Sequence, residues 1–161
     1  MYEHIKFKNA INMRKANYDK FPSTKLTGML VQGWDIIISM LKEKMDARKV
    51  LAVDLYTGVY EEEVLDAFSK EFSGRVMNVR DLMKPEKEIQ TLTERFMTED
   101  VLFGYVTNLK LEDYLDADKV AAARKQISEA KETIVIIGTG ASVVAPQDAM
   151  VVYADMARWE I

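Results

Sequence analysis

The sequence contains no cysteine and a single histidine, His4. The absence of cysteine excludes disulfide scaffolds, thiol nucleophiles and thiolate metal sites. One histidine cannot supply a site that needs two or more imidazole ligands from the same chain. Basic residues are not in excess either, because 26 Asp and Glu outnumber 22 Lys and Arg and leave a net charge of −4. This balance disfavours nucleic acid and anionic membranes as partners.

The sequence also lacks long apolar runs and a secretion signal. Apolar runs such as 134–137 and 150–154 are far shorter than the ~18 residues that a membrane span needs. The first eight residues carry charges throughout and contain no hydrophobic signal core. We therefore expect a cytoplasmic protein that does not insert into membranes.

The length and composition that remain suit one globular domain. Of the 161 residues, 48% are hydrophobic and 30% are charged, which is typical of a folded chain with a real core. Residues 1–32 contain Pro22 and Gly28 and are expected to form an extended or looped N-terminal extension. An α/β domain is expected at 33–161. Its last residues, 154–161, begin a helical pattern without a stop signal, so we expect the chain to be part of a longer protein.

The α/β assignment follows from the order of apolar patterns. Strands are expected at 50–55, 75–79, 133–137 and 149–154, and helices near 33–45, 61–72, 85–96 and 116–130 and after Asp155. Ile89, Leu92 and Phe96 are expected to give the third helix a buried face. The continuous apolarity of 50–55 is typical of a strand buried on both faces of a parallel sheet. The pattern predicts a three-layer α/β sandwich with a mainly parallel sheet, which would bind ligands beyond the carboxyl ends of its strands.

The first candidate loop is the segment 54–63, which joins a predicted strand to a predicted helix through Gly58. This is the position of a phosphate-binding loop, but such a loop uses a lysine, and here Tyr60 and Glu61–Glu63 occupy its place. A like charge at about 4 Å costs about 1 kcal/mol in water, so these carboxylates disfavour a triphosphate. They equally suit the positive end of a helix. The residues of this loop that remain candidates to bind a cation or a sugar hydroxyl are Tyr56, Thr57 and Gly58.

Asp54 is a separate candidate, because it closes an otherwise apolar strand. A carboxylate in that position must find partners or lie at the surface of a crevice. It can hold a metal ion or a sugar hydroxyl, or it can cap the following loop as an Asx turn.

Two further strand ends carry candidate residues. Gly138 and Gly140 follow a predicted strand and let the backbone approach a ligand, while the hydroxyls of Thr139 and Ser142 can bond to it; a plain turn is the alternative. Asp155 either caps the last helix, with Arg158 as its pair one turn later, or shares a site in which Arg158 binds a phosphate.

Four segments, 17–23, 33–35, 53–63 and 153–161, resemble the N-terminal region of a bacterial family described as class I mannose-6-phosphate isomerases, in which such a domain precedes a zinc-binding cupin. The same region is similar to uridine-kinase-like domains, with a degenerate Walker A loop at 54–63 and with 153–155 at the strand-to-helix step. The resemblance implies a P-loop-kinase-like fold with a degenerate phosphate loop.

The resemblance also implies a role in carbohydrate metabolism. The zinc ligands of the cupin have no counterpart in this chain, so we expect no metal or cofactor here and zinc only in a downstream cupin. The expected function is an accessory, non-catalytic domain that binds a small phosphorylated sugar or nucleotide. One alternative is a divergent nucleoside or sugar kinase. The other alternative is a structural or oligomerisation module that forms a homo-oligomer. Trp159 and the apolar last strand suggest this alternative.

Overall fold

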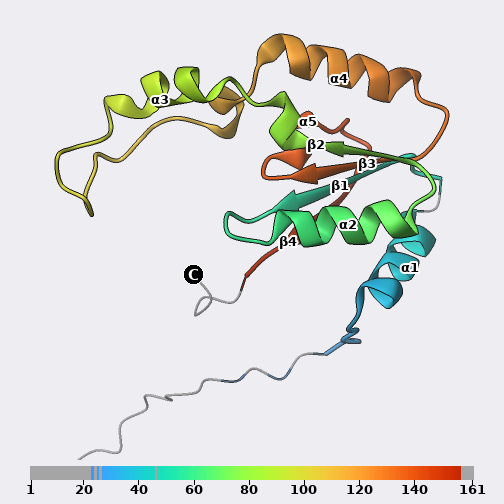
Figure 1. Ribbon diagram of the computed structural model, residues 1–161. Coiled ribbons are helices and arrows are strands. Elements are labelled where there is room, and N and C mark those ends of the chain that lie inside the picture. The colour runs from blue at the N-terminus through green and yellow to red at the C-terminus, as the bar shows by residue number, and fades with distance from the viewer. Residues whose placement is uncertain (1–22, 24, 26, 46, 157–161) are drawn as a thin grey trace, which may run out of the picture. The chain divides into compact units, whose positions relative to one another are not determined.

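The computed structural model describes residues 23, 25, 27–45 and 47–156. The chain divides at residue 30, and its second unit comprises residues 31–161. The second unit alternates helices and strands along the chain (Figure 1). Its elements are α1 (Trp34–Met45), β1 (Val50–Leu55), α2 (Glu61–Glu71), β2 (Arg75–Asn78), the 3-10 turn η1 (Val79–Leu82), α3 (Glu86–Glu94), the 3-10 turn η2 (Leu111–Tyr114), α4 (Ala117–Glu129), β3 (Ile134–Gly138), α5 (Ala141–Val144) and β4 (Met150–Ala154).

The four strands form one sheet in the order β2-β3-β1-β4, and every pairing is parallel. In the register, Val53 lies opposite Ile137 on β3 and Val152 on β4. The two central strands, β1 and β3, are buried along almost their whole length, as continuous apolar runs require in a sheet that is covered on both sides.

Helices cover both faces of the sheet and give the expected three layers (Figure 1). On one face, α1 and α2 contribute residues such as Ile38 and Phe68 to a core cluster. On the other face, α4 and α5 contribute Ile127 and Val144 to a second cluster. Because successive residues of a strand point to opposite faces, Ala52 of β1 belongs to the second cluster and its neighbours Leu51 and Val53 to the first. The predicted α/β sandwich is confirmed.

The structure corrects the sequence interpretation at α3. No residue of α3 is buried, and Ile89, Leu92 and Phe96 are only half-buried, so the prediction of a buried face is wrong. Figure 1 shows the reason: α3 and the chain that follows it extend away from the sheet, where no second layer is available for the apolar stripe. Residues 157–161 of the expected last helix lie outside the described residues. Among the helices that the structure describes, none is both long enough and apolar enough to cross a membrane.

Candidate functional site

The loops that follow β1 and β3 leave the sheet toward opposite faces. The loop after β1 leads into α2, which packs in one core cluster, and the loop after β3 leads into α5, which packs in the other. Since β1 and β3 are neighbours, their carboxyl ends form the kind of crevice in which open parallel sheets bind ligands. A hollow of about 410 Å³ lies at this place and is lined by residues 55–62, Arg80 and Thr139. We call it the carboxyl-end hollow.

Asp54 holds the two loops together. Its carboxylate accepts hydrogen bonds from the backbone N–H groups of Gly140 at 2.9 Å and Ser142 at 3.0 Å, and the hydroxyl of Ser142 also donates to it. These N–H groups lie at the start of α5, where a helix leaves its first donors without intrahelical partners. The N–H group that an Asx turn would use, that of Tyr56, donates instead to the carbonyl of Ala154 at 2.9 Å. Asp54 therefore caps a distant loop, not its own, and the expected Asx turn is not formed.

Gly138 and Gly140 allow the backbone conformation that the loop after β3 requires. Gly138 has a φ of 134° and Gly140 a φ of 86°, both in the region that favours glycine. A Cβ added at Gly138 would lie 2.9 Å from the Cβ of Val79, so only glycine fits at this contact. Thr139 lies between them, is exposed, and reaches the carboxyl-end hollow.

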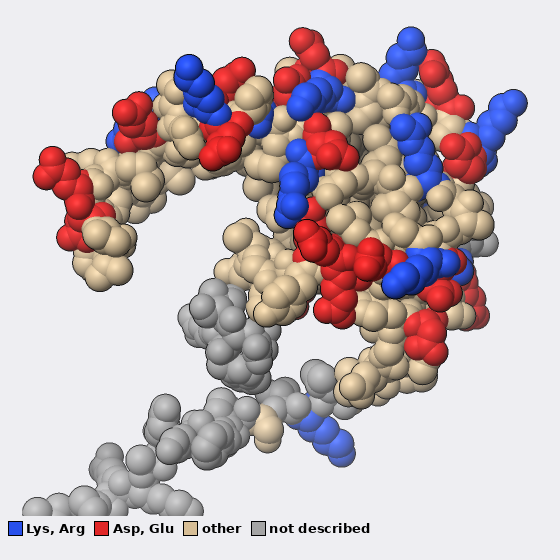
Figure 2. All heavy atoms as spheres, in the orientation of Figure 1, with Lys and Arg blue, Asp and Glu red and all other residues tan. Residues whose placement is uncertain are grey.

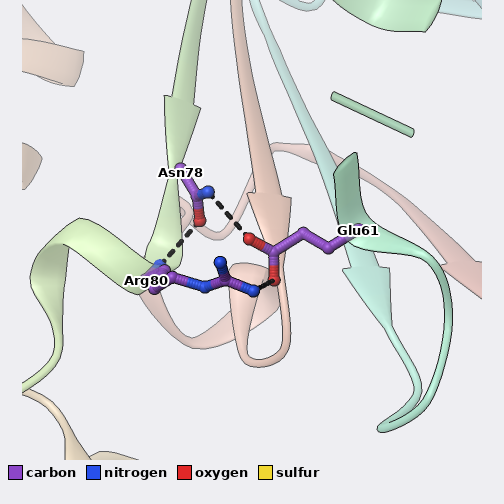
Figure 3. Close-up of polar contacts among 3 residues, drawn as sticks. All are labelled: Glu61, Asn78 and Arg80. Carbon is purple, nitrogen blue, oxygen red and sulfur yellow. Dashed lines mark hydrogen bonds and ion pairs between the residues drawn. The ribbon is translucent and has the colours of Figure 1, made fainter. Parts of the chain in front are cut away.

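A second polar group lies on the other side of the hollow and joins α2 to the end of β2 (Figure 3). Glu61 accepts a hydrogen bond from Asn78 Nδ2 at 2.8 Å and pairs with the Arg80 guanidinium at 3.4 Å. Asn78 Oδ1 accepts the backbone N–H of Arg80 at 2.7 Å. The side chain of Glu61 is only 17% exposed, whereas that of Arg80 is 62% exposed. The arrangement holds both the backbone and the guanidinium of Arg80, while most of the side chain stays exposed to solvent beside the hollow.

The acidic first turn of α2 has contacts that its sequence alone does not reveal. Glu61 joins the network just described, and Glu63 accepts a hydrogen bond from Trp34 Nε1 at 2.9 Å, which ties α2 to α1. Glu62 is exposed and lines the carboxyl-end hollow. Within the described part of the chain, the lining thus contains two carboxylates and one guanidinium, and neither lysine nor histidine. Such a surface suits a ligand with hydroxyl groups and at most a small anionic group.

Four of the sequence-predicted site residues line the hollow: Tyr56, Thr57, Gly58 and Thr139. Asp54, Gly138 and Gly140 lie behind it and shape the loops. Asp155 is exposed, does not line the hollow, and accepts a hydrogen bond from the N–H of its neighbour Met156 at 2.8 Å. Arg158, and with it the expected pair of Asp155 and Arg158, lies outside the described residues.

Asn78 was not among the sequence candidates, although a signal for it exists. Like Asp54, it is a polar residue that closes a strand, and such a residue needs a partner at the crevice. For metals, the described ranges contain no cluster of three or more His, Cys, Asp or Glu side chains that could hold an ion.

When the chain is compared with known proteins, one family model matches it. The model of a domain family described as "Domain of unknown function (DUF8485)" matches residues 33–161. No curated protein and no solved structure matches the chain. The matched range begins one residue before α1 and includes the whole described sheet.

Proposed function

The chain belongs to the DUF8485 family, and from its own residues we propose that it is an accessory, non-catalytic domain that binds a phosphorylated sugar in the carboxyl-end hollow. The observation that carries this proposal is the guanidinium of Arg80, which Glu61 anchors and which stays open to solvent at the rim of the hollow. Arginine binds a phosphate group well because its planar donors match the phosphate oxygens.

The other lining residues favour the sugar part of such a ligand. The exposed Glu62 and the hydroxyls of Thr57 and Thr139 are acceptors and donors for sugar hydroxyl groups. A volume of about 410 Å³ falls in the range of small-molecule sites. The two carboxylates disfavour a triphosphate, since each like charge at about 4 Å costs about 1 kcal/mol even in water. A monophosphate with a hydroxyl-rich body suits this lining better than a nucleotide.

The proposal places the domain in a cytoplasmic protein of sugar-phosphate metabolism, similar to mannose-6-phosphate isomerases, with zinc and catalysis in a downstream cupin. It rests on the resemblance of the four sequence segments. Within this proposal the domain uses no cofactor of its own.

Thermal unfolding with and without ligand tests the proposal. Mannose 6-phosphate should raise the unfolding midpoint more than mannose, inorganic phosphate or ATP at equal concentration, because only it uses both parts of the hollow. Arg80→Ala should abolish the shift. The matched control is Arg75→Ala, which removes an exposed arginine at the opposite end of β2 and should leave the shift intact. A chain that no sugar phosphate stabilises, or one whose shift survives Arg80→Ala, would refute it.

A further inference from the structure

The most unusual surface of the molecule is an arm formed by residues 85–110, which begins with α3 and returns to η2. Its base is clamped to the domain. Met83 and Leu115 form an antiparallel bridge, and the N–H groups of Lys84 and Asp116 donate to Tyr114 and Leu82 at 3.0 and 2.9 Å. The arm leaves the sheet near the end of β2 and extends outward (Figure 1).

The end of the arm, residues 97–106, exposes six large apolar side chains. They are between 70% and 98% exposed, and they are Met97, Val101, Leu102, Phe103, Tyr105 and Val106. Six exposed side chains of this size form an apolar patch on the order of several hundred Å², which approaches the roughly 800 Å² per partner of a standard protein interface. Single-chain proteins seldom leave so large an apolar patch uncovered.

The backbone of this tip is ordered by its own hydrogen bonds. Asp100 Oδ1 accepts the N–H groups of Leu102 and Phe103 at 2.8 and 3.1 Å, and the hydroxyl of Thr98 donates to the carbonyl of Phe103. The N–H of Tyr105 donates to Phe96 at 2.8 Å and closes the loop. A tip whose backbone is held by these hydrogen bonds while its apolar side chains are exposed is preorganised to bind a protein surface.

A second hollow lies at the opposite edge of the same sheet. A hollow of about 950 Å³, which we call the amino-end hollow, lies beside the first residues of β1 and β3. Its lining includes the buried side chains of Val50, Ile134 and Val144. Among the described residues of this lining, four side chains are cationic, those of Lys44, Arg48, Lys49 and Arg124, and two are acidic, those of Glu132 and Asp148.

The tip has the opposite charge. Residues 97–106 contain Glu99 and Asp100 and no lysine or arginine, and in Figure 2 the end of the arm is apolar and acidic. The tip therefore has apolar side chains beside carboxylates, and the described lining of the amino-end hollow has apolar side chains beside more cations than carboxylates. Complementary charge of this kind orients two surfaces and suppresses wrong pairings.

We propose that the tip of the arm, residues 97–106, docks into the amino-end hollow of a second copy of this chain. The tip and the hollow are different surfaces, so the contact is heterologous and leaves one free tip and one free hollow in every open assembly. This association uses neither the carboxyl-end hollow nor its ligand, and it stands or falls independently of the proposed sugar-phosphate binding.

Sedimentation velocity over a range of protein concentrations tests the proposal, with one variant for each surface. Phe103→Asp places a charge in the apolar tip, and Ser128→Trp fills the amino-end hollow from an exposed position on α4. Each should reduce the association of the wild-type chain at least tenfold. The matched controls are Ile36→Asp, at an exposed apolar residue in the first turn of α1, and Ala121→Trp, at an exposed position of α4 outside the hollow. Both should associate as the wild type does.

Mixing the two variants gives the decisive result. The Phe103→Asp chain keeps its hollow and the Ser128→Trp chain keeps its tip, so the mixture should form a one-to-one complex that grows no further, although each variant alone is monomeric. A wild-type chain that stays monomeric would overturn the proposal. Association that survives Ser128→Trp but not Phe103→Asp would overturn the hollow as the acceptor, because it would show that the tips bind one another.

Discussion

Asp54 places a charged group at the end of a buried strand, and its three donors all come from the start of α5. Asp54→Ala would leave the N–H groups of Gly140 and Ser142 without their acceptor, and an unsatisfied buried donor costs about 1–3 kcal/mol. Because Asp54 is half-buried, water can reach part of the site, and we expect a loss of about 2 kcal/mol in the free energy of unfolding, measured by urea denaturation.

Two comparisons make this prediction specific. Asp54→Asn keeps an acceptor oxygen and should lose less stability than Asp54→Ala. Asp66→Ala removes an exposed carboxylate from α2 and should change stability little. An Asp54→Ala chain as stable as the Asp66→Ala chain would show that the clamp across β1 and β3 contributes nothing.

Tyr153 on β4 gives the fold a dependence on alkaline pH. Desolvation raises its pKa above the usual 10.0, and the nearby Asp155, Tyr56 and Asp54 raise it further. The folded state then holds the phenolic proton more tightly than the unfolded state does. The resulting stability is complete below pH 10 and is lost as the pH rises through the raised pKa. The effect should be small, because the Tyr153 side chain is 60% exposed.

Urea denaturation at a series of pH values that extends above 10 measures this contribution. The Tyr153→Phe chain should lose less stability than the wild type over that range, since it has no proton to release. Tyr105→Phe, at an exposed tyrosine of the arm, is the control and should follow the wild type. Parallel curves for all three chains would contradict the prediction.

At the residue scale, the sequence identifies several polar residues of the site but does not predict their hydrogen-bond partners. The polar closure of an apolar strand identified Asp54, yet its partners lie 86 and 88 positions along the chain. The same holds for Glu61, which is 17 residues from Asn78. The helix-dipole interpretation of the glutamates was physically sound but local, so it did not predict that Glu61 anchors Arg80.

Among the elements, α3 and α4 show how the same kind of sequence pattern can lead to different packing. Both have an apolar stripe, but α4 buries Val120, Ala123 and Ile127 against the sheet, while α3 has no buried residue. Segments with little buried surface open at a lower free energy than the core. The backbone amides of α3 should therefore exchange with deuterium well before those of α4.

Hydrogen exchange followed residue by residue measures the difference, and β3 serves as the internal reference for a fully buried element. Dilution below the concentration at which copies associate separates the free arm from a docked one. Equal protection in α3 and α4 in the dilute chain would show that the arm packs on the domain.

Element boundaries were predicted well where local chemistry decides them. A helix is expected to begin near Asp116, and the Asp116 carboxylate caps α4 by accepting the N–H groups of Asp118 and Lys119 at 3.0 and 3.1 Å. In contrast, the sequence predicts a loop or turn where the structure has α5. It has four residues, which is too short to show a helical period, and the cap that holds its first turn comes from Asp54 on another strand.

At the scale of the whole molecule, the layers could be predicted and the order of the strands could not. Burial patterns say that β1 and β3 are covered on both faces, but an apolar run does not specify its neighbour. In the order β2-β3-β1-β4, the connection from β1 to β2 runs one way through α2 on one face, and the next two connections run the other way through α4 and α5 on the opposite face. Because the connections that follow β1 and β3 leave toward opposite faces, a crevice forms between the ends of these two strands. The sequence therefore predicts that a crevice exists, but not which residues face each other across it.

Because the sheet separates the two core clusters, we expect substitutions within one cluster to be energetically coupled and substitutions in different clusters to be additive. Phe68 and Phe72 stack at 5.6 Å in the cluster under α1 and α2, whereas Ile127 belongs to the cluster on the other face. In a double-mutant cycle by urea denaturation, Phe68→Leu and Phe72→Leu should couple by about 0.5–1.5 kcal/mol, because stacked rings contribute beyond their buried area. Phe68→Leu and Ile127→Val share no contact surface and should add to within about 0.5 kcal/mol. Coupling of the second pair as large as that of the first would mean that the sheet transmits packing changes between its faces, and the two clusters would then have to be treated as one core.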